Sequence, residues 1–354
     1  MKEKIESLLA GISAPDGDGD LISEKIAETT CDDNGAKVVL YFPYPAQSVF
    51  ADMQKKVTEC LAAADIQAQV RCENRIYPRV VQGGVRRLPE VKNIIAVASG
   101  KGGVGKSATA VNLALALAAE GARVGMLDAD VYGPSLPTML GVHRRPQGVD
   151  GGIAPLTAFG MQVMSIGFMV EDDQPAIWRG PIASRALTQL LEDTKWDGLD
   201  YLVLDMPPGT GDIQLTAAQK MPITGAVIIT TPQDLALSDA QRGIVMFNKT
   251  AVPVLGLVEN MSVYICPQCG HEAHIFGGGG AHRLAEKYQS EVLGEVPLDE
   301  SIRSDADAGT PTMVSSPDGE IAARYRQIAR RAAARLAQKP RDRSGGIPQI
   351  VAEK

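Results

Sequence analysis

One glycine-rich stretch that ends in lysine and serine constrains this chain more than any other feature. Residues 98–107 read Ala-Ser-Gly-Lys-Gly-Gly-Val-Gly-Lys-Ser and lie between the apolar run 94–97 and a helix-like run that begins at Ala108. They match the Gly-x-x-x-x-Gly-Lys-Ser template in the strand-then-helix context that the template requires. A flexible turn without a ligand does not need Lys-Ser after its last glycine. The stretch therefore predicts a nucleotide-binding loop.

The residue types of this loop suit phosphate binding for separate physical reasons. Glycine lets the backbone approach phosphates closely, while the backbone N–H groups and the helix N-terminus attract an anion. We expect Lys106 to reach the β- and γ-phosphate oxygens and the Ser107 hydroxyl to bind Mg²⁺. The template does not require a lysine at position 101, so Lys101 indicates a subclass. The candidate nucleotide-binding residues are Gly100, Lys101, Gly102, Gly103, Val104, Gly105, Lys106 and Ser107.

Strand and helix signals alternate along the chain after residue 90. This alternation predicts an α/β fold with a mostly parallel, doubly wound P-loop NTPase sheet, and the near-continuous apolar strands indicate helices on both faces. We expect strands at 93–98, 123–127, 161–166, 201–204, 226–230, 254–258 and 292–296. We expect helices at 107–120, 182–194, 235–248, 281–290 and 320–338.

The sequence divides into three segments. Residues 1–89 are predicted to form a small α+β unit with a linker, and residues 90–338 the P-loop domain. Residues 339–354 are rich in charged residues, glycine and proline and are predicted to be disordered. Within the first unit we expect a strand at 37–43, an amphipathic helix at 46–64, a second strand at 66–70 and the linker at 82–89.

The predicted helix at 320–338 combines an apolar stripe with five arginines. We interpret it as a helix that packs on the sheet and exposes a solvated basic face. A helix that lies on a membrane surface is the alternative.

Charge and composition restrict the partners and the location. A net charge of −7 argues against a general nucleic-acid binder. The chain has no apolar run of membrane-spanning length and begins without the apolar core of a signal peptide, so we expect a cytoplasmic protein without stable membrane association. Five cysteines, an odd number, favour thiol or metal chemistry over a disulfide framework. Cys31, Cys60 and Cys72 have no ligand spacing and are interpreted as ordinary cysteines.

Three aspartates stand at the ends of predicted strands. Asp205 ends the run 201–204, where a nucleotide-binding sheet needs a carboxylate near Mg²⁺. It leads into a Pro-Pro-Gly-Thr-Gly loop, in which the Gly209 N–H is a candidate to contact a γ-phosphate. Asp128 and Asp130 end another strand on the same side. We expect Asp130 to orient the attacking water and Asp128 to have a supporting or metal-linked role.

A Cys-Pro-Gln-Cys-Gly turn at residues 266–270 is the second chemical centre. Two thiolates separated by two residues can bind one metal ion and leave its other coordination positions open. His271 and His274 follow, so a zinc site within one chain is one alternative. Two chains that each contribute Cys266 and Cys269 could instead complete a four-thiolate site for zinc or a [4Fe–4S] cluster. A redox dithiol is a third alternative.

These motifs occur together, in this order, in one known family. Lys101, Asp128-Ala-Asp130-x-x-Gly-Pro-Ser, Asp205-Met-Pro-Pro-Gly-Thr-Gly-Asp and Cys266-Pro-Gln-Cys269-Gly make the chain closely resemble the Mrp/ApbC family of iron–sulfur cluster carriers. That family belongs to the deviant-Walker-A, SIMIBI class of P-loop ATPases. The resemblance covers residues 91–336. Residues 1–89 are similar in position and size to the short assembly-type domain that precedes the ATPase in bacterial members.

The resemblance implies a role for each candidate residue. Lys101 would reach phosphate across a homodimer interface, and Ser107 stands where many relatives have threonine, which keeps the hydroxyl for Mg²⁺. Cys266 and Cys269 would join their counterparts in a second subunit to hold one labile [4Fe–4S] cluster. Asp130 would be the switch I aspartate, and Asp205 and Gly209 would belong to the Walker B and switch II region. The other implied assignments are Asn260 and Pro297 at adenine, Lys101, Lys106, Asp130 and Asp205 in catalysis, and Ser107, Asp128 and Asp205 at Mg²⁺.

The predicted function is a slow, Mg²⁺-dependent ATPase that takes a cluster from an iron–sulfur donor scaffold and passes it to apo-proteins. We expect slow turnover because the sequence has no evident arginine finger. A lysine that crosses to a partner makes nucleotide binding and dimer geometry one event, so hydrolysis would reset the dimer. The alternatives are a MinD/ParA-like positioning ATPase, which has no need of the cysteine pair, and a zinc-stabilised dimeric ATPase.

Overall fold

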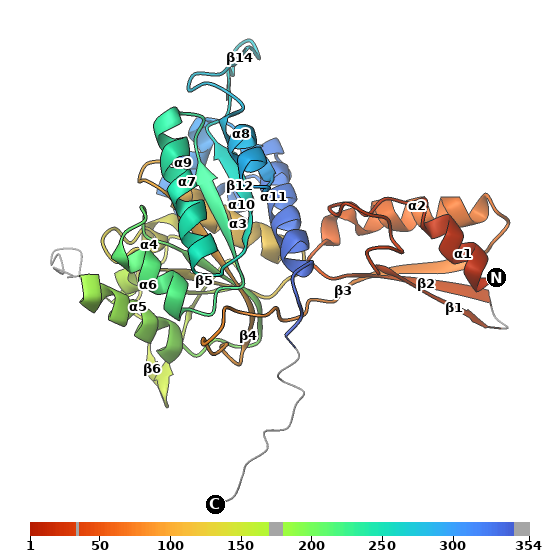
Figure 1. Ribbon diagram of the computed structural model, residues 1–354, viewed down its shortest axis with the longest axis horizontal. Coiled ribbons are helices and arrows are strands. Elements are labelled where there is room, and N and C mark those ends of the chain that lie inside the picture. Colours follow the sequence, from red (N-terminus) through yellow and green to blue (C-terminus); the bar gives the residue numbers. More distant parts are fainter. Residues whose placement is uncertain (33–34, 170–179, 343–354) are drawn as a thin grey trace, which may run out of the picture.

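The computed structural model describes residues 1–32, 35–169 and 180–342. They form a small N-terminal unit beside a larger α/β body, as Figure 1 shows. Residues 343–354, most of the segment predicted to be disordered, lie outside the described residues. The residues just before them are paired, because the Val80 N–H donates to the Pro340 carbonyl and the Asp342 N–H donates to the Pro78 carbonyl. The described chain therefore ends beside the connection between its two parts.

The larger body is built on an eight-stranded sheet in the order β15-β12-β11-β4-β10-β5-β9-β8. All neighbouring strands are parallel except β8, which is antiparallel to β9. The prediction of a mostly parallel sheet is confirmed, and β8 is the strand of this sheet that it missed. The strands are β4 (Val91–Ser99), β5 (Val124–Asp128), β8 (Leu156–Ala158), β9 (Met161–Ser165), β10 (Leu199–Asp205), β11 (Gly225–Thr230), β12 (Val254–Asn260) and β15 (Val292–Val296).

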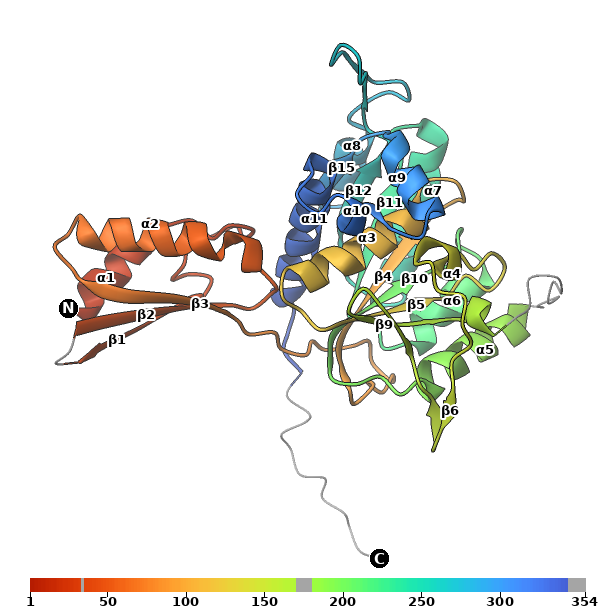
Figure 2. The ribbon, with the colours of Figure 1, turned by 180° about the vertical axis from the view of Figure 1, so that it is seen from behind.

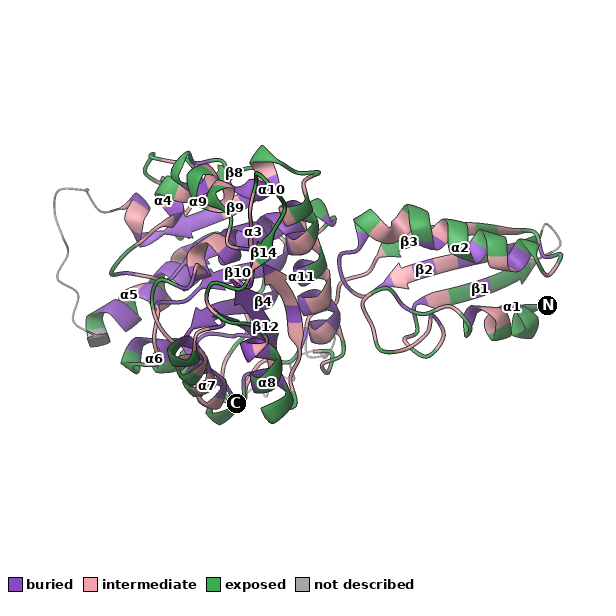
Figure 3. Ribbon diagram, turned by 90° about the horizontal axis from the view of Figure 1, so that it is seen from above, coloured by how far each residue is buried: buried purple, intermediate pink, exposed green. Residues whose placement is uncertain are grey.

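Helices cover both faces of this sheet. Helices α3, α9, α10 and α11 lie on the face seen in Figure 2, and α5, α6, α7 and α8 lie on the face seen in Figure 1. The sheet between them is buried (Figure 3), and every residue of β10 and β11 is buried. The helices are α3 (Lys106–Ala119), α4 (Leu136–Met139), α5 (Gly180–Asp193), α6 (Asp212–Lys220), α7 (Asp234–Lys249), α8 (Gly280–Lys287), α9 (Glu300–Asp307), α10 (Thr312–Ser315) and α11 (Glu320–Ala337).

Two short antiparallel ribbons and one short 3₁₀ helix complete the body. The ribbons are β6 (Gly148–Val149) with β7 (Gly152–Ile153), and β13 (Tyr264–Ile265) with β14 (Glu272–Ala273). The 3₁₀ helix, η2 (Ile166–Phe168), directly follows β9. Such short elements are stabilised by their attachment to the body rather than by their own length.

The N-terminal unit has a three-stranded sheet in the order β1-β2-β3. The side chains of β2 alternate between buried and more exposed positions, so one face of the sheet is covered and the other is open to solvent. Helix α1 packs against β1, and α2 packs against β3. The elements are α1 (Lys2–Leu9), β1 (Ala27–Asp32), β2 (Gly35–Phe42), η1 (Gln47–Val49), α2 (Phe50–Ala62) and β3 (Ala68–Asn74).

The last strand of this unit differs from its predicted position at 66–70. The chain turns at Asp65, which has a φ of 58°, and the Ile66 N–H donates to the Leu61 carbonyl at the end of α2. Ile66 is buried against the helix that precedes it. The apolar side chain therefore closes the helix end, and the strand begins only at Ala68.

The N-terminal unit is anchored to the end of α3, the helix that follows the glycine-rich loop. Glu120, the residue after α3, is fully buried. Its carboxylate accepts hydrogen bonds from the Ser48 N–H at 2.9 Å, the Ser48 hydroxyl at 2.6 Å and the Arg330 guanidinium at 3.1 Å. The Asn74 side chain donates to the Glu120 carbonyl at 2.9 Å, and Arg330 also pairs with Asp16 at 3.0 Å. Segments from three distant parts of the sequence therefore share one buried ion-pair cluster.

Four arginines of α11 bind other parts of the chain, in contrast to the solvated basic face that we expected. Arg330 and Arg335 form ion pairs with carboxylates of the N-terminal unit. Arg324 and Arg331 donate to carbonyls of the edge strand β15 at 3.3 and 3.2 Å. Among the described residues, no helix has both the length and the apolar character needed to cross a membrane. Helix α11 thus packs on the face of the sheet over the edge strand β15 and fastens the N-terminal unit.

Replacing Glu120 by alanine is expected to lower the free energy of unfolding by about 3 kcal/mol, because it removes one carboxylate from a buried guanidinium. It should also expose the connection at residues 78–90 to protease, because Ser48 loses its two hydrogen bonds to the Glu120 carboxylate. Urea unfolding and limited proteolysis measure the two effects. Glu59→Ala, in an exposed ion pair of α2, is the control and should change stability by less than about 0.5 kcal/mol. Equal behaviour of the two variants would contradict the anchoring role.

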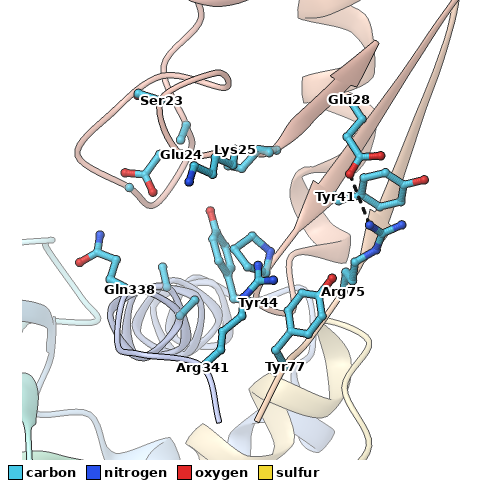
Figure 4. A pocket seen from close by; sticks show the side chains of 16 residues that line it. Ser23, Glu24, Lys25, Glu28, Tyr41, Tyr44, Arg75, Tyr77, Gln338 and Arg341 are labelled. Atoms are coloured by element: carbon cyan, nitrogen blue, oxygen red, sulfur yellow. Dashed lines mark hydrogen bonds and ion pairs between the residues drawn. The ribbon is translucent and has the colours of Figure 1, made fainter. Parts of the chain in front are cut away.

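A cavity of about 570 Å³ lies at this junction, between the N-terminal unit and the end of α11 (Figure 4). Two of its walls are stacked cation–aromatic pairs. The Arg75 guanidinium lies 3.4 Å from the centre of the Tyr41 ring, and the Arg341 guanidinium lies 3.8 Å from the centre of the Tyr77 ring. Such pairs hold the walls in place. Acidic and basic side chains both line the cavity, so its charge favours no class of ligand.

Candidate functional site

The carboxyl ends of three adjacent strands bring the predicted nucleotide site together. Asp205, at the end of β10, pairs in the sheet with Val97 of β4 on one side and with Asp128 of β5 on the other. The loops that follow these strands therefore meet at one edge of the sheet. Open α/β sheets bind their ligands at this edge. The structure thus gathers the glycine-rich loop, the Pro-Pro-Gly loop and the Asp130 loop, as the sequence predicted.

The glycine-rich loop is tightly packed on one side and open on the other. A side chain at Gly100 would collide with the Asp239 backbone at 2.1 Å, and one at Gly105 would collide with the Asn260 amide at 2.1 Å. Gly102 and Gly103, by contrast, have no atom within 4 Å of the place where a Cβ would be. Packing therefore explains Gly100 and Gly105. The open space at Gly102 and Gly103 is suited to a ligand that lies against the backbone.

Lys106 and Asp205 form a buried ion pair at the centre of the site. The Lys106 side chain is 6% exposed and that of Asp205 is 1% exposed, and the ammonium group donates directly to the carboxylate. The Lys106 ammonium also lies 3.1 Å from the Ser107 hydroxyl. A lysine and a carboxylate that are removed from water must neutralise each other when no ligand does so. The two side chains therefore form an ion pair at a position where a charged ligand could replace either partner.

Asp128 fixes the loop that carries Asp130. Its carboxylate accepts hydrogen bonds from the backbone N–H groups of Asp130, Ser135 and Leu136 at 3.0–3.2 Å. It also accepts from the Ser165 hydroxyl at 3.1 Å. Both carboxylate oxygens are thus used within the chain, which corresponds to the supporting role among the predicted ones. Sequence reasoning missed Ser165, although its place at the end of a predicted neighbouring strand could have indicated it.

The burial of Asp128 makes stability depend on pH. Burial raises the pKa of Asp128 to about 7, and the nearby Asp205 carboxylate adds to the rise. The folded state therefore holds a proton that the unfolded chain has already released above about pH 4. The contribution of this group to stability is complete below that pH and is lost as the pH rises toward 7.

We therefore expect the nucleotide-free protein to lose about 2–4 kcal/mol of unfolding free energy through Asp128 between pH 4.5 and 7.5. Urea unfolding at several pH values measures the slope. Asp128→Asn, which does not titrate, should show a flatter slope than the wild type. Parallel slopes in the two proteins would contradict the assignment.

Asp130 lines a groove of about 600 Å³. Its carboxylate accepts hydrogen bonds from the N–H groups of Tyr132 and Gly133, both at 3.2 Å. Burial raises the pKa of Asp130, while the Lys106 ammonium opposes the rise. The opposite wall of the groove is the loop from Pro207 to Gln214. This position between two loops is suitable for a carboxylate that orients a water molecule.

Gly209 is held against the glycine-rich loop. Its N–H donates to the Ser99 carbonyl at 2.9 Å, and its φ is 100°. The Ser99 hydroxyl donates in turn to the Lys101 carbonyl at 2.8 Å. The N–H that the sequence predicts for the γ-phosphate is therefore bound to the chain itself in this structure.

Asn260 and Pro297 lie at the ends of β12 and β15, which are neighbouring strands. Asn260 is buried, and its side-chain amide donates to the Val104 carbonyl of the glycine-rich loop at 2.9 Å. Pro297 is also buried. Sequence reasoning missed Glu259, whose buried carboxylate accepts from the Ala281 N–H at 2.7 Å and positions the start of α8. Asn260 thus joins the loop to the strands on this side of the site.

Lys101 lies in the same loop as Lys106, but its surroundings are different. The Lys101 side chain is partly exposed, and within the described ranges its ammonium group has no hydrogen-bond or ion-pair partner. An unpaired ammonium group is free to reach an anion that lies outside its own chain. This environment is compatible with the predicted contact across an interface.

The two cysteines of the metal motif lie on a ribbon that projects from the body. The strands β13 and β14 stand out beyond α8 in Figure 1. Cys266 and Cys269 occupy the turn between them, where the Cys266 N–H donates to the His271 carbonyl at 3.0 Å and the Gly270 N–H donates to the Cys266 carbonyl at 2.8 Å. Cys269 is exposed and Cys266 is partly exposed. The turn therefore presents both thiols to solvent.

The turn also favours the thiolate form that metals bind. The backbone N–H groups of Gln268 and Cys269 lower the pKa of the Cys266 thiol, and the Cys269 side chain acts in the same direction. His274 uses its Nδ1 atom on the Ser262 carbonyl at 3.0 Å. In the part of the chain that the structure describes, no group of three or more His, Cys, Asp or Glu side chains is placed to hold a metal ion. The predicted alternative of a zinc site with His271 and His274 is therefore not assembled.

The other three cysteines lie in the N-terminal unit. Cys31 is exposed, while Cys60 and Cys72 are partly buried and their thiols lie near the Leu8 and Phe50 carbonyls. Burial raises the pKa of Cys72 to about 11, so this thiol stays protonated. They fit the prediction of ordinary cysteines.

Comparison with known proteins finds a matching family model and relatives whose names agree with it. The family model described as ParA, NUBPL iron-transfer P-loop NTPase, matches residues 90–333. The iron-sulfur cluster carrier protein of Escherichia coli is 65% identical over 248 residues, which are 70% of this chain and 67% of that protein. The iron-sulfur cluster carrier protein of Pseudomonas fragi is 52% identical over 280 residues, which are 78% of this chain and 97% of that protein. The iron-sulfur cluster transfer protein NUBPL of Mus musculus is 52% identical over 253 residues, which are 71% of this chain and 79% of that protein.

Solved structures show the same fold. A nucleotide-binding protein in complex with ADP from Archaeoglobus fulgidus has a TM-score of 0.58 and 38% identity, and the match covers 66% of this chain and 92% of that one. The cell division ATPase MinD of Pyrococcus furiosus has a TM-score of 0.53 and 22% identity, and the match covers 67% of this chain and 96% of that one. At that identity the second likeness shows the fold alone.

Proposed function

The chain belongs to the NUBPL iron-transfer family of P-loop NTPases, and we propose that it is an ATP-hydrolysing carrier that binds an iron–sulfur cluster and passes it to apo-proteins. The observation that carries this proposal is the combination of two sites in one chain. A phosphate-binding loop with an open backbone stands at the sheet edge, and two exposed thiols stand on a projecting ribbon. The relatives at 52–65% identity are named as cluster carriers or transfer proteins.

The nucleotide site would bind the phosphates of ATP along Gly100–Ser107. Lys106 would turn from Asp205 to the β- and γ-phosphate oxygens, and this would leave the Asp205 carboxylate free. Ser107 and Asp205 offer the oxygen ligands that Mg²⁺ prefers, with Asp128 in support. When bound, Mg²⁺ neutralises charge on the phosphate oxygens. Asp130 would orient the water that attacks the γ-phosphate, while Asn260 and Pro297 would lie at the adenine.

The cluster would be bound between two copies of the chain. Each chain offers two thiols, and a four-iron cluster is held by four. Lys101, whose ammonium group is unpaired within the described residues, would reach the phosphates bound by the partner. Nucleotide binding would thereby set the geometry of the dimer, and with it the spacing of the four thiols. Hydrolysis would be slow and would reset the dimer.

The alternatives carry less support. One alternative is a positioning ATPase of the MinD/ParA type, but such a protein has no need of two exposed thiols. Zinc at the four thiols is the other alternative, and metal analysis distinguishes it from iron. In this proposal the protein works in the cytoplasm, takes its cluster from a donor scaffold and binds neither nucleic acid nor a membrane. Residues 1–89 would be a small domain of the assembly type.

A transfer experiment tests the function. The full-length protein, reconstituted anaerobically with iron and sulfide, is mixed with an apo-enzyme that needs a [4Fe–4S] cluster, and the recovery of enzyme activity is followed. We expect faster recovery than with equal amounts of free iron and sulfide, and a dependence on Cys266. Recovery that is no faster than with the free ions would overturn the carrier function.

A further inference from the structure

The peptide bond between Pro208 and Gly209 is held at both of its polar atoms. On one side, the Gly209 N–H donates to the Ser99 carbonyl at 2.9 Å. On the other side, the Pro208 carbonyl accepts a hydrogen bond from the side-chain amide of Gln214. The carbonyl and N–H of one trans peptide point in opposite directions. The two contacts therefore fix the orientation of the whole peptide plane.

Gln214 is well placed to hold this loop. It lies in the first turn of α6, the residue is 5% exposed, and its amide also lies 3.2 Å from the Pro207 carbonyl. Prolines have no N–H, so the carbonyls of Pro207 and Pro208 are the polar backbone atoms of this stretch. One amide group with two hydrogens can serve both carbonyls. The Gln214 side chain therefore links the start of α6 to the loop that contains Gly209.

The backbone here is suited to a rotation of this one peptide. Gly209 has a φ of 100°, which glycine adopts without strain and other residues rarely adopt. A proline followed by a glycine can change between the type II and type I turn geometries. The change rotates the peptide between them by about half a turn and brings the glycine φ to about −90°. Such a rotation would turn the Gly209 N–H away from Ser99 and break the contact of Pro208 with Gln214.

We propose that Gln214 is a specificity-determining residue of the nucleotide site, because it holds the Pro208–Gly209 peptide in the orientation that withholds the Gly209 N–H from a γ-phosphate. The inference rests on the proposed ATPase function and assigns a role to a residue that touches no nucleotide itself. ATP, but not ADP, offers a γ-phosphate that the released N–H would contact. The hydrogen bond from Gln214 therefore weakens the binding of ATP and leaves the binding of ADP unchanged.

This proposal predicts that the hydrogen bond of Gln214 changes the affinity for ATP but not the affinity for ADP. A ligand shifts a two-state equilibrium only by its different affinities for the two states. Removing one hydrogen bond that stabilises the withheld orientation should raise the affinity for ATP by about 3–10-fold. ADP, which binds both orientations equally, should bind as in the wild type.

The test uses the full-length protein with Mg²⁺ and equilibrium competition of ADP and of a non-hydrolysable ATP analogue against a fluorescent ADP. Gln214→Met keeps the volume of the side chain and removes the amide. We expect the analogue to bind this variant about 3–10-fold more tightly, with an ADP affinity within about twofold of the wild type. Gln219→Ala, at an exposed position of the same helix, is the matched control and should change neither affinity.

The outcomes separate this inference from the proposed function. An unchanged or weaker affinity of Gln214→Met for the analogue overturns the role of Gln214, and so does an equal weakening for both nucleotides, which indicates a structural role. If Gln214→Met does not fold, Gln214→Glu, which has the same shape and lacks the donor, is measured with the same criteria. If the wild type binds neither nucleotide, the proposed function itself fails, whatever the variants do.

Discussion

Replacing Lys106 by alanine is expected to reduce ATP hydrolysis by at least about 100-fold, the effect of removing one positioned charge from developing phosphate charge. The structure gives two reasons. The Lys106 ammonium is the buried cation at the phosphate-binding loop, and Asp205, with 1% of its side chain exposed, would lose its ion-pair partner. An uncompensated buried carboxylate would also repel the phosphates of the nucleotide. Phosphate release and nucleotide affinity are the measurements.

The second lysine of the loop provides the comparison. Lys101→Ala removes an ammonium group that has no partner in the described part of the chain, so stability should be unchanged. We expect this variant to bind nucleotide as a monomer but to lose hydrolysis, because the lysine is proposed to act in the partner's site. Mixing Lys101→Ala with a variant that cannot bind nucleotide should restore part of the activity. For Lys106→Ala, hydrolysis above a tenth of the wild-type rate would contradict the role assigned to Lys106 in binding the phosphates.

The sequence predicted the nucleotide site because its parts are local patterns. A glycine-rich loop between a strand and a helix, and aspartates at strand ends, are close in space in any parallel sheet. All seven predicted strands of the large sheet are present, since buried parallel strands are continuous apolar runs. The edge strand β8 and the two ribbons were missed, because segments of two or three residues carry no period to detect.

Contacts between distant parts of the chain could not be predicted. The solvated face expected for α11 is instead occupied by Asp16 and Asp18 of the N-terminal unit, some three hundred residues earlier in the sequence. Glu120 looks like an ordinary helix-terminal residue, yet it is the buried centre of the junction. The partners of such side chains depend on how two units dock, which no local pattern contains. Gln214 was missed for a different reason: its acceptors are backbone carbonyls of the preceding loop, which no residue type in the sequence marks.

The attachment of the N-terminal unit at the end of α3 connects this unit mechanically to the nucleotide site. Helix α3 starts at the phosphate-binding loop and ends at Glu120, where the N-terminal unit is attached. A helix moves largely as a rigid body, so a displacement at its first turn would be passed to its last. The Glu120→Ala variant therefore also serves to separate the two units energetically without touching the loop.

Replacing Cys266 by alanine is expected to abolish cluster binding altogether. At a site shared by two identical chains, one substitution removes two of the four ligands. The substitution also removes the thiol whose pKa the N–H groups of Gln268 and Cys269 lower and whose metal-binding form they favour. Anaerobic reconstitution, followed by visible absorbance and metal analysis, should give about two iron atoms per wild-type chain and almost none in the variant.

The other cysteines make this experiment selective. Cys31→Ala removes an exposed thiol that lies outside the ribbon, so it should keep the full iron content of the wild type. Equal iron in Cys266→Ala and Cys31→Ala would mean that iron binds to thiols in general and not at the ribbon. Zinc in place of iron in the wild type would mean that the four thiols hold a structural ion, because tetrahedral thiolate sites accept either metal. Loss of iron together with the dimer, measured by sedimentation, would show that the cluster itself joins the two chains.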